Sequence, residues 1–431
     1  MTQKSILALA VCTALAGAGN LSLAENSTTG PFGFEPIDAS ASSAGWDPSA
    51  PWKIPAGFTQ TVVSDETDLN LYNGSRNDRH DMNTVNETGR QAGRYLYRTH
   101  ELRAPENQPE GGAVSVVDLQ TGITRLLARD KSFDAVDGIR WTPWQTILFA
   151  EEIEGGRLFE IILNDDLVSG TVIDRPAVGR LAHEGIEIGP DGAVYVVDEH
   201  RGLTQGCAIG IPCGGGVYKF VPDTRGDLSS GNLYALRVLK NADLEGVGQA
   251  EWVGPIDPLN ARQSGSEFGG TSYQRPEDLE IIGNTLYVAI TEGTPDMFGD
   301  QNYDGRIIAI DLNSMQVSNY VKPGINVPVE NSAPGNPGFR TGFDNPDNLA
   351  ESPDGKLIIV EDNVPSDIWF AGKDHDNDGA ADSVWLFGSL SDPGAEGTGI
   401  YFGKDPTTLF VNIQHSAAKD GDGTWAISPA R

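Results

Sequence analysis

The chain has 431 residues, with 61 acidic and 30 basic side chains, which give a formal net charge of −31 and an isoelectric point near 4.4. A charge of this sign and size disfavours nucleic acids and anionic membranes as partners. The 52 glycines and 26 prolines indicate a turn-rich chain, and no window of ten or more residues after the N-terminus has convincing helical periodicity. We therefore expect an all-β fold.

The N-terminus has the pattern of a secretory signal. Lys4 precedes an apolar stretch over residues 6–18, and Ser22 and Ala24 are small residues ahead of a cleavage site at Glu25. The pattern predicts a signal peptide over residues 1–24 and a periplasmic or secreted protein. The apolar stretch is too short to span a bilayer, and no later stretch has 18 apolar residues, so we expect no membrane insertion. Residues 25–60, rich in Ser, Ala and Pro, are expected to form an extended leader.

Short hydrophobic runs recur along the rest of the chain. Five of them end in an acidic residue and a sixth ends in Gln-His: 95–101, 147–152, 193–199, 285–292, 357–362 and 408–415. Two units, 185–200 and 348–363, share a Pro-Asp-Gly turn between two apolar stretches, which predicts hairpins. Units of about 40 to 50 residues with several strands are typical of propeller blades. We predict one domain over residues 61–431, a six-bladed β-propeller with loop insertions; a β-sandwich or two small β-domains are the alternatives.

Acidic residues stand at the same point of each repeat, so they converge if the repeats surround an axis. The candidates at strand starts and strand ends include Asp137, Glu151, Glu184, Glu277, Asp347 and Glu396. Oxygen ligands of this kind suit hard cations, and Ca²⁺ takes six to eight of them. Crowded carboxylates without a cation would raise one another's pKa. The sequence therefore predicts a shared metal pocket.

Two further features predict a structural calcium site and a disulfide. Asp374, Asp376 and Asp378 stand at positions 1, 3 and 5 of a loop with Gly at position 6, and Asp382 follows. This is the start of a calcium loop, although position 12 lacks the Glu of an EF-hand, so we expect a structural calcium site. Cys207 and Cys213 lie in a glycine-rich insertion, and in an oxidising compartment we expect them to form a disulfide.

Several motifs together resemble PhoX-type bacterial alkaline phosphatases, over residues from about 95 to 416. They are Trp-Thr-Pro-Trp-Gln-Thr at 141–146 with Glu-Glu at 151–152, His183-Glu184, Arg275-Pro276-Glu277, Asn-Pro-Asp-Asn-Leu-Ala at 345–350 and Leu-Phe-Val-Asn-Ile-Gln-His at 409–415. The resemblance implies a six-bladed propeller and an exported, calcium-dependent phosphomonoesterase that acts on a small phosphoester. It also implies a cluster of iron and calcium held by carboxylates and bridged by a cysteine.

The resemblance also implies roles for individual residues. Glu184, Glu277, Asp347 and Glu396 would be metal ligands, with Glu151 and Glu152 nearby. Arg275 would bind the phosphate, a role that its planar guanidinium suits, and Glu277 would take part in catalysis beside it. The chain departs from the family at Asp137, which stands where these phosphatases carry the bridging cysteine. This substitution puts the iron pair in doubt and favours calcium or another metal.

Two other classes of function stay open at this point. A calcium-dependent lactonase or esterase would hold its ion with Glu184, Asp347 and Asn348, and would use His183 or His100 as a base. A non-catalytic secreted propeller would use calcium only to stabilise the ring. In each case we expect a monomer.

Overall fold

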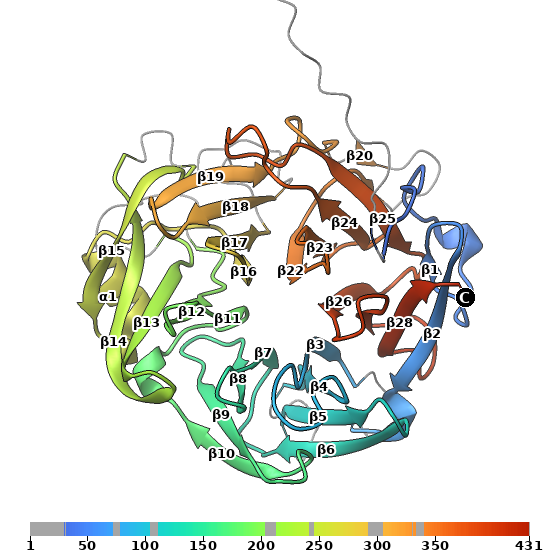
Figure 1. Cartoon of the computed structure of the whole chain (residues 1–431), viewed down its shortest axis with the longest axis horizontal. Helices are drawn as coiled ribbons and strands as arrows, with labels where there is room; N and C mark the ends of the chain where they lie inside the picture. The colour runs from blue at the N-terminus through green and yellow to red at the C-terminus, as the bar shows by residue number, and fades with distance from the viewer. Residues whose placement is uncertain are drawn as a thin grey trace, which may run out of the picture.

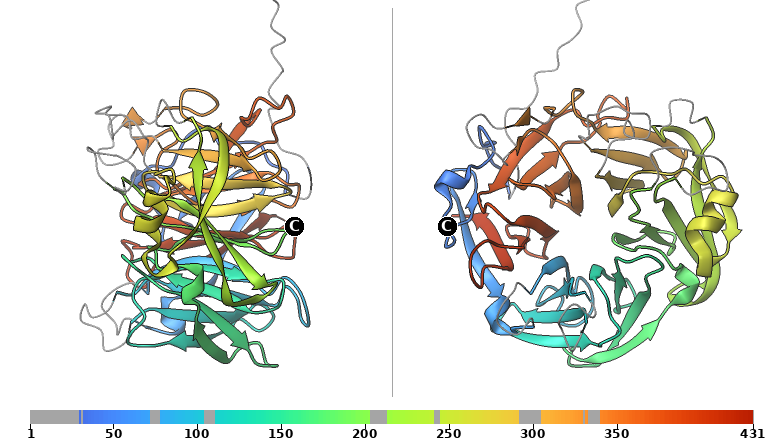
Figure 2. Two further views of the ribbon diagram at one scale, coloured as in Figure 1. Left: turned by 90° about the vertical axis from the view of Figure 1, so that its left-hand side faces the viewer. Right: turned by 180° about the vertical axis from the view of Figure 1, so that it is seen from behind.

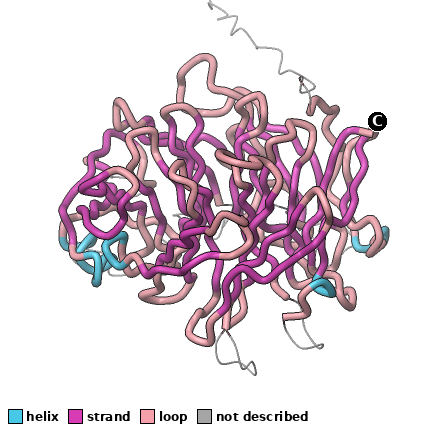
Figure 3. The backbone as a smooth tube through the Cα atoms, turned by 60° about the horizontal axis from the view of Figure 1, so that its bottom comes forward, coloured by secondary structure: helices cyan, strands magenta, loops and turns pink. Residues whose placement is uncertain are grey.

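The computed structural model describes residue 30 and residues 32–71, 78–103, 111–202, 213–240, 245–291, 305–329, 331–332 and 340–430. Strands dominate these ranges (Figure 3), which confirms the all-β class. The helices are α1 (Ala261–Glu267) and four short 3₁₀ helices, η1 (Ser43–Gly45), η2 (Glu66–Asp68), η3 (Pro176–Val178) and η4 (Pro258–Asn260). Among the described residues, no helix is long and apolar enough to cross a membrane.

The strands form sheets that surround a central axis (Figure 1), and their long strands run between the two faces of the ring (Figure 2). The innermost strands are β3 (His80–Val85), β7 (Val136–Trp141), β11 (Ile186–Ile188), β16 (Pro276–Ile282), β22 (Pro346–Glu351) and β26 (Glu396–Phe402). From each of them the sheet continues outward through antiparallel neighbours. This is the arrangement of a propeller.

The outer strands follow in order from each inner strand. β3 is followed by β4 (Tyr95–His100), β5 (Ala113–Asp118) and β6 (Ile123–Arg129); β7 by β8 (Ile147–Glu151), β9 (Leu158–Leu163) and β10 (Gly170–Asp174). β22 is followed by β23 (Leu357–Glu361), β24 (Asp367–Ala371), β25 (Val384–Leu390) and β1 (Trp52–Lys53); β26 by β27 (Leu409–Gln414), β28 (Gly423–Pro429) and β2 (Phe58–Asp65). A two-stranded sheet, β20 (Asn331–Ser332) and β21 (Arg340–Thr341), stands apart.

One sheet is larger than the others. β11, β12 (Val194–Val197), β13 (Val217–Thr224), β14 (Asp227–Val238) and β15 (Gly248–Ile256) join β19 (Gln316–Val321), β18 (Arg306–Asp311), β17 (Thr285–Ile290) and β16 in a nine-stranded sheet. The junction between β15 and β19 consists of two residue pairs, Gly248 with Val317 and Gln249 with Gln316. Because of this junction, the sheets of the described residues confirm a propeller-like ring but not the expected number of six separate blades.

The hydrophobic core lies between neighbouring sheets. One cluster packs Tyr97 and Val116 of the first sheet against Trp141, Phe149 and Phe159 of the next. Some second strands are covered on both faces and are therefore largely apolar: every residue of β8 and β23 is buried. These are the runs that the sequence shows as repeats.

The N-terminal segment packs along the outside of the last sheets. Phe32 and Phe34 are buried among the rings of Phe58, Phe370 and Phe387, at centroid distances of 4.8 to 6.1 Å. β1 pairs with β25 and β2 pairs with β28, so N-terminal strands form the outer edges of the two C-terminal sheets. The boundary expected at residue 61 falls inside β2.

A buried acidic group joins the first inner strand to the last sheet. Glu66 Oε2 accepts a hydrogen bond of 3.0 Å from the Asp78 N–H, and the Glu66 N–H donates to the Asp422 carbonyl over 3.1 Å. Glu66, Asp78 and Asp422 are all buried. Burial, followed by the charge of Asp422, raises the pKa of Glu66 to about 8. Glu66 is therefore protonated in the folded protein at neutral pH.

We predict that Glu66 makes stability depend on pH. Because its pKa rises from 4.5 in the unfolded chain to about 8, its stabilisation is complete below the lower value and is lost as the pH rises through the upper one. Glu66→Gln keeps an acceptor for the Asp78 N–H and removes the titration. We expect the Tm of the native protein to fall more than that of Glu66→Gln between about pH 5 and about pH 9, as measured by calorimetry. The exposed Glu267→Gln should follow the native protein; parallel curves for all three would contradict the prediction.

Candidate metal centre

Carboxylates stand at the start of the inner strands. Asp81, Asp137, Glu277 and Asp347 are each the second residue of their strand, Glu396 is the first residue of β26, and Glu184 precedes β11 by two positions. Because the inner strands surround one axis (Figure 1), their starts bring these side chains toward a common centre.

A local irregularity accompanies four of these residues. The ladder between the first two strands shifts register directly after the carboxylate, between His80 and Asn83 in β3 and at the corresponding points of β7, β16 and β22. The residue two positions before the carboxylate has a positive φ in the same four strands: 48° at Arg79, 42° at Ala135, 49° at Arg275 and 43° at Asn345. Bulges and left-handed residues of this kind redirect a side chain at the cost of local strain.

A second set of side chains follows the adjacent strands. The backbone N–H groups of Glu101, Glu152, Glu199, Thr291 and Asp362 donate to the carbonyls of Arg79, Ala135, Ala182, Arg275 and Asn345, over 2.8 to 3.0 Å. These bonds place the end of the second strand beside the start of the first. In the fourth repeat the equivalent residue is Thr291, and Glu292, which the sequence suggested, lies outside the described residues.

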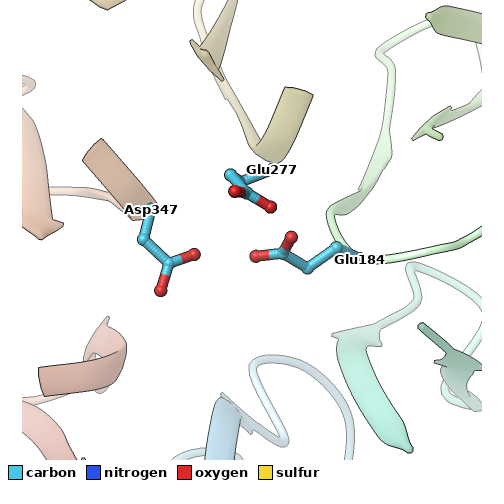
Figure 4. Close-up of side chains that lie close together, drawn as sticks. All are labelled: Glu184, Glu277 and Asp347. Atoms are coloured by element: carbon cyan, nitrogen blue, oxygen red, sulfur yellow. The ribbon is translucent and has the colours of Figure 1, made fainter. Parts of the chain in front are cut away.

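Three carboxylates meet at the centre. Glu184, Glu277 and Asp347 each offer an oxygen, and these oxygens all lie within 4.8 Å of one another. Figure 4 shows the three side chains pointing toward one another, Glu277 from β16, Asp347 from β22 and Glu184 from the loop before β11. Glu184 and Glu277 are buried and Asp347 is half-buried. These are three of the predicted ligands.

The cluster is electrostatically unfavourable without cations. Burial, reinforced by Glu277 and Asp347, raises the pKa of Glu184 well above its usual range, and burial also raises the pKa of Glu277 to about 7, against the opposing effect of Arg275. Asp137 behaves alike, since burial and the charge of Asp81 raise its pKa. Buried charges of one sign need protons or cations to balance them.

The donor atoms fit a hard cation. Asp137 Oδ1 and Glu277 Oε1 are buried and accept no hydrogen bond from the described residues. Arg275 Nη2 lies 3.0 Å from Glu277 Oε1 as an ion pair, outside hydrogen-bond geometry. Every donor in the cluster is a carboxylate oxygen, which is the chemistry that Ca²⁺ and similar ions prefer.

Further acidic residues extend the cluster. Burial raises the pKa of Asp137, Asp347 and Glu396, and the charge of Asp81 raises all three further. Asp362 also raises the pKa of Asp347 and Glu396, so these groups interact electrostatically. Asp81 is not among the predicted ligands, because the first repeat recognisable in the sequence begins at the second strand, residue 95. The signal was present, since His80-Asp81 aligns with Val136-Asp137.

Glu151 is a correction to the predicted ligand set. Its Oε2 accepts from the Arg157 N–H and Nε–H at 3.1 and 2.8 Å, while Oε1 accepts from the Asp134 N–H at 3.1 Å and lies 2.5 Å from Arg157 Nη2. Both oxygens are thus bound at the end of β8, away from the converging group. The next residue, Glu152, faces the cluster instead, where Glu199 and Glu101 raise its pKa in addition to burial.

Two arginines border the carboxylates. Arg275 Nε donates to Glu199 Oε1 at 2.5 Å, and its Nη2 pairs with Glu277. Arg103 Nη2 lies 2.5 Å from Glu101 Oε1 and donates to Glu152 Oε2 at 3.1 Å. The predicted phosphate-binding residue Arg275 is therefore beside the predicted ligand Glu277.

The groups of the lactonase alternative are arranged differently. Asn348 Oδ1 accepts from the Gly399 N–H at 2.5 Å, so its amide presents N–H groups, not oxygen, to Asp347 Oδ1 at 2.9 Å and Glu184 Oε1 at 3.3 Å. His183 and His100 are fully buried, and burial lowers their pKa to about 4 and about 3. Asn348 thus braces two carboxylates, and neither histidine is exposed to a substrate.

The predicted calcium loop and the predicted disulfide lie apart from the central carboxylates. In the calcium loop, oxygens of Asp374, Asp376 and Asp382 lie within 4.8 Å of one another. Asp378 is not in this group; its N–H donates to Asp374 and Asp376, and its own Oδ1 accepts from the Ala380 N–H. Cys213 is disulfide-bonded. Its expected partner Cys207 and the signal peptide over residues 1–24 lie outside the described residues.

We predict that Gly138 is required for the position of Glu184. A Cβ at Gly138 would lie 1.7 Å from the Glu184 carbonyl oxygen, so Gly138→Ala must displace the backbone that carries this carboxylate. We expect a loss of roughly 1–3 kcal/mol of stability from the overlap, together with weaker metal binding measured by calorimetry. The control is Gly45→Ala, whose Cβ would have no neighbour within 4 Å. Native metal affinity in Gly138→Ala would contradict the prediction.

Comparison with known proteins identifies the family. A family model described as alkaline phosphatase PhoX matches residues 156–417. Pseudomonas fluorescens PhoX in complex with vanadate, a transition state analogue, superposes with a TM-score of 0.63 at 16% identity, covering 92% of this chain and 98% of that one. A putative gluconolactonase gives 0.48 at 13% identity (90% and 97% covered), and the periplasmic gluconolactonase of Pseudomonas aeruginosa 0.42 at 13% (81% and 85%). No curated protein matches the sequence. Because the family model spans more than half of its length, the chain belongs to the PhoX alkaline phosphatase family.

Proposed function

We propose that the protein is an exported metal-dependent phosphomonoesterase. Family membership supports a phosphoric monoester hydrolase, and the convergence of Glu184, Glu277 and Asp347 beside Arg275 is the observation that carries the proposal. Divalent cations, when bound, supply Lewis acidity toward a phosphoryl group and neutralise its charge. A small phosphoester is the substrate, with no nucleic acid partner.

The residues of the chain have distinct tasks in this scheme. Glu184, Glu277, Asp347, Asp137 and Glu396 would hold the cations. Arg275 would hold a phosphoryl oxygen, since Nε and Nη2 are fixed by Glu199 and Glu277 and its remaining N–H groups have no partner among the described residues. A guanidinium fixed in this way is preorganised, so little conformational entropy is lost when it binds an oxyanion.

We infer calcium, not iron, as the principal metal. Asp137 contributes an oxygen where the family resemblance leads us to expect a bridging thiolate, and its Oδ1 has no hydrogen-bond partner in the described part of the chain. Cys213 is already in a disulfide. An all-oxygen site of this size suits Ca²⁺ and is a poor match for ions that prefer sulfur.

Two finer points complete the proposal. We infer that β11–β15 and β16–β19 are separate blades joined only at their outer edges, which gives six blades; the limited pairing of two residue pairs supports this. We also infer a periplasmic or secreted location from the N-terminal signal pattern. The disulfide at Cys213 supports it, since disulfides persist in oxidising compartments.

The lactonase alternative has less support, because Asn348 offers no oxygen to an ion beside Asp347 and Glu184. A non-catalytic propeller is distinguished by experiment. Elemental analysis of the purified protein, combined with a p-nitrophenyl phosphate assay before and after chelation, should give calcium together with turnover that chelation abolishes. Calcium without turnover would favour the binding propeller.

We predict that the central carboxylates control both metal content and turnover. Glu277→Gln and Asp347→Asn each remove a charge from the converging group. We expect metal affinity and turnover to fall by more than about a hundredfold, since even outer partners of metal sites contribute 10- to 100-fold. Glu151→Gln is the matched control, because the Glu151 carboxylate pairs with Arg157. This variant should keep the native metal content, although it should be less stable. Native metal content and turnover in both central variants would refute the proposal.

We predict a separate calcium effect at the loop of Asp374, Asp376 and Asp382. Calcium at about a hundredfold excess over its Kd should stabilise the fold by about 2.7 kcal/mol. Tm measured with and without calcium, in an Asp347→Asn background that weakens the central site, should show a rise that Asp376→Asn and Asp382→Asn remove. The exposed Asp223→Asn should retain it. An equal rise in all four proteins would exclude the loop as a calcium site.

A further inference from the structure

A second group of basic residues stands beside the metal centre, in addition to Arg275. Arg103 follows β4, Arg79 precedes β3, and His415 follows β27. Arg103 and Arg79 both contact Glu101, through its carboxylate and its carbonyl at 2.5 and 3.4 Å. Burial lowers the pKa of His415, and the charges of Arg79 and Arg103 lower it further. His415 Nε2 lies 3.3 Å from Glu396 Oε1. We call these three residues the basic group.

The basic group lies nearer to solvent than the carboxylates it contacts. The Arg103 side chain is 39% exposed, whereas Glu101 and Glu152 are 9% and 18% exposed. His415 is 41% exposed, against 19% for Glu396. The side chains of Arg103 and His415 thus form the outer layer of the site on this side, and the carboxylates form the inner layer.

Arg103 retains hydrogen-bonding capacity for a ligand. Its contacts with Glu101 and Glu152 are both made by Nη2. Nε and Nη1 have no partner in the described part of the chain. They belong to a guanidinium group whose position is fixed by two carboxylates. A guanidinium held at Nη2, with Nε–H and Nη1–H groups still unpaired, can donate hydrogen bonds to a carboxylate or phosphate.

The basic group and Arg275 come from strands on different sides of the ring. Arg275 directly precedes β16, while Arg103 follows β4 and Arg79 precedes β3, and β3 and β4 lie across the ring axis from β16 (Figure 1). A phosphoryl group held at the central carboxylates by cations and Arg275 therefore leaves the basic group to face the rest of the substrate. In a chain of net charge −31, this outer layer attracts anions locally.

We propose that Arg103, assisted by Arg79 and His415, determines substrate preference by binding a second anionic group on the leaving group of the phosphoester. The proposal rests on the phosphomonoesterase function above and adds a substrate class to it: esters whose alcohol carries a carboxylate or a further phosphate. Arg103 acts on the part of the substrate that is not transferred. Its effect should therefore depend on the charge of the leaving group.

The test compares phenyl phosphate with 3-carboxyphenyl phosphate. The native protein, loaded with calcium, should have a higher kcat/KM for the carboxylated ester. Arg103→Met removes the charge and keeps the length of the side chain, so the ratio of the two kcat/KM values should fall about tenfold, equivalent to 1.4 kcal/mol. Arg103→Lys should retain part of the ratio. Differences in leaving-group chemistry cancel, because the same two esters are compared in each protein.

The same preference is measured without turnover by calorimetry, using phenylphosphonate and 3-carboxyphenylphosphonate. If neither ester is hydrolysed, the phosphomonoesterase proposal fails, while the binding ratio still decides the role of Arg103. Arg237→Met is the matched control, since Arg237 is 40% exposed and paired with Glu251 on an outer strand. No preference in the native protein, or an equal loss for both ligands in Arg103→Met, would overturn the inference.

Discussion

Repulsion among buried carboxylates is the constraint on which the rest of the structure depends. At 4.8 Å, the upper limit of the separations among the three oxygens, and an effective dielectric constant of about 20, two unit charges repel by about 3.5 kcal/mol. Three such pairs among Glu184, Glu277 and Asp347 would equal a large part of the 5 to 15 kcal/mol by which folded proteins are typically stable. The ring therefore holds this arrangement only if protons or cations compensate the charges. The centre therefore suits a cation, and contacts elsewhere in the fold must offset the repulsion that remains.

Those contacts link each inner strand to the next. Asp278 Oδ2 accepts from the Leu349 N–H of β22 at 2.8 Å, and Asn348 Oδ1 accepts from the Gly399 N–H of β26. Farther along the inner strands, Arg140 of β7 pairs with both Glu187 of β11 and Glu280 of β16. Because bulges follow the carboxylates, one residue of a strand faces the centre while the next one reaches the neighbouring strand. The same irregularity thus collects the charges and joins the sheets that resist their repulsion.

The repeats in the sequence were sufficient to predict the fold class and the convergence of acidic residues, because strand ends at equal positions in a ring must meet. They were insufficient to predict which of two adjacent residues faces the centre. Glu151 and Glu152 are adjacent in sequence, yet only Glu152 faces the centre, since Arg157 binds the other. Asp81 was missed because its strand has a single polar-rich segment, His80–Val85, with little hydrophobic signal. The junction of β15 and β19 depends on two glycine- and glutamine-containing pairs that no periodicity indicates.

The net charge of the whole chain and the charges beside the metal centre act over different distances. At physiological ionic strength the Debye length is about 8 Å, so most of the net charge of −31 is screened from a substrate at the centre. What remains are the groups within a few ångströms: the carboxylates, their cations, Arg275 and Arg103. Each of these arginines is paired with two carboxylates and keeps N–H groups without a partner among the described residues. Lysine, with a single rotatable ammonium, would not hold two carboxylates and still present a fixed donor edge. An acidic protein can therefore receive an anionic ester only where cations outweigh the carboxylates locally, and because Arg275 and Arg103 are each outnumbered by the two carboxylates they contact, bound metal ions would have to supply the remaining positive charge.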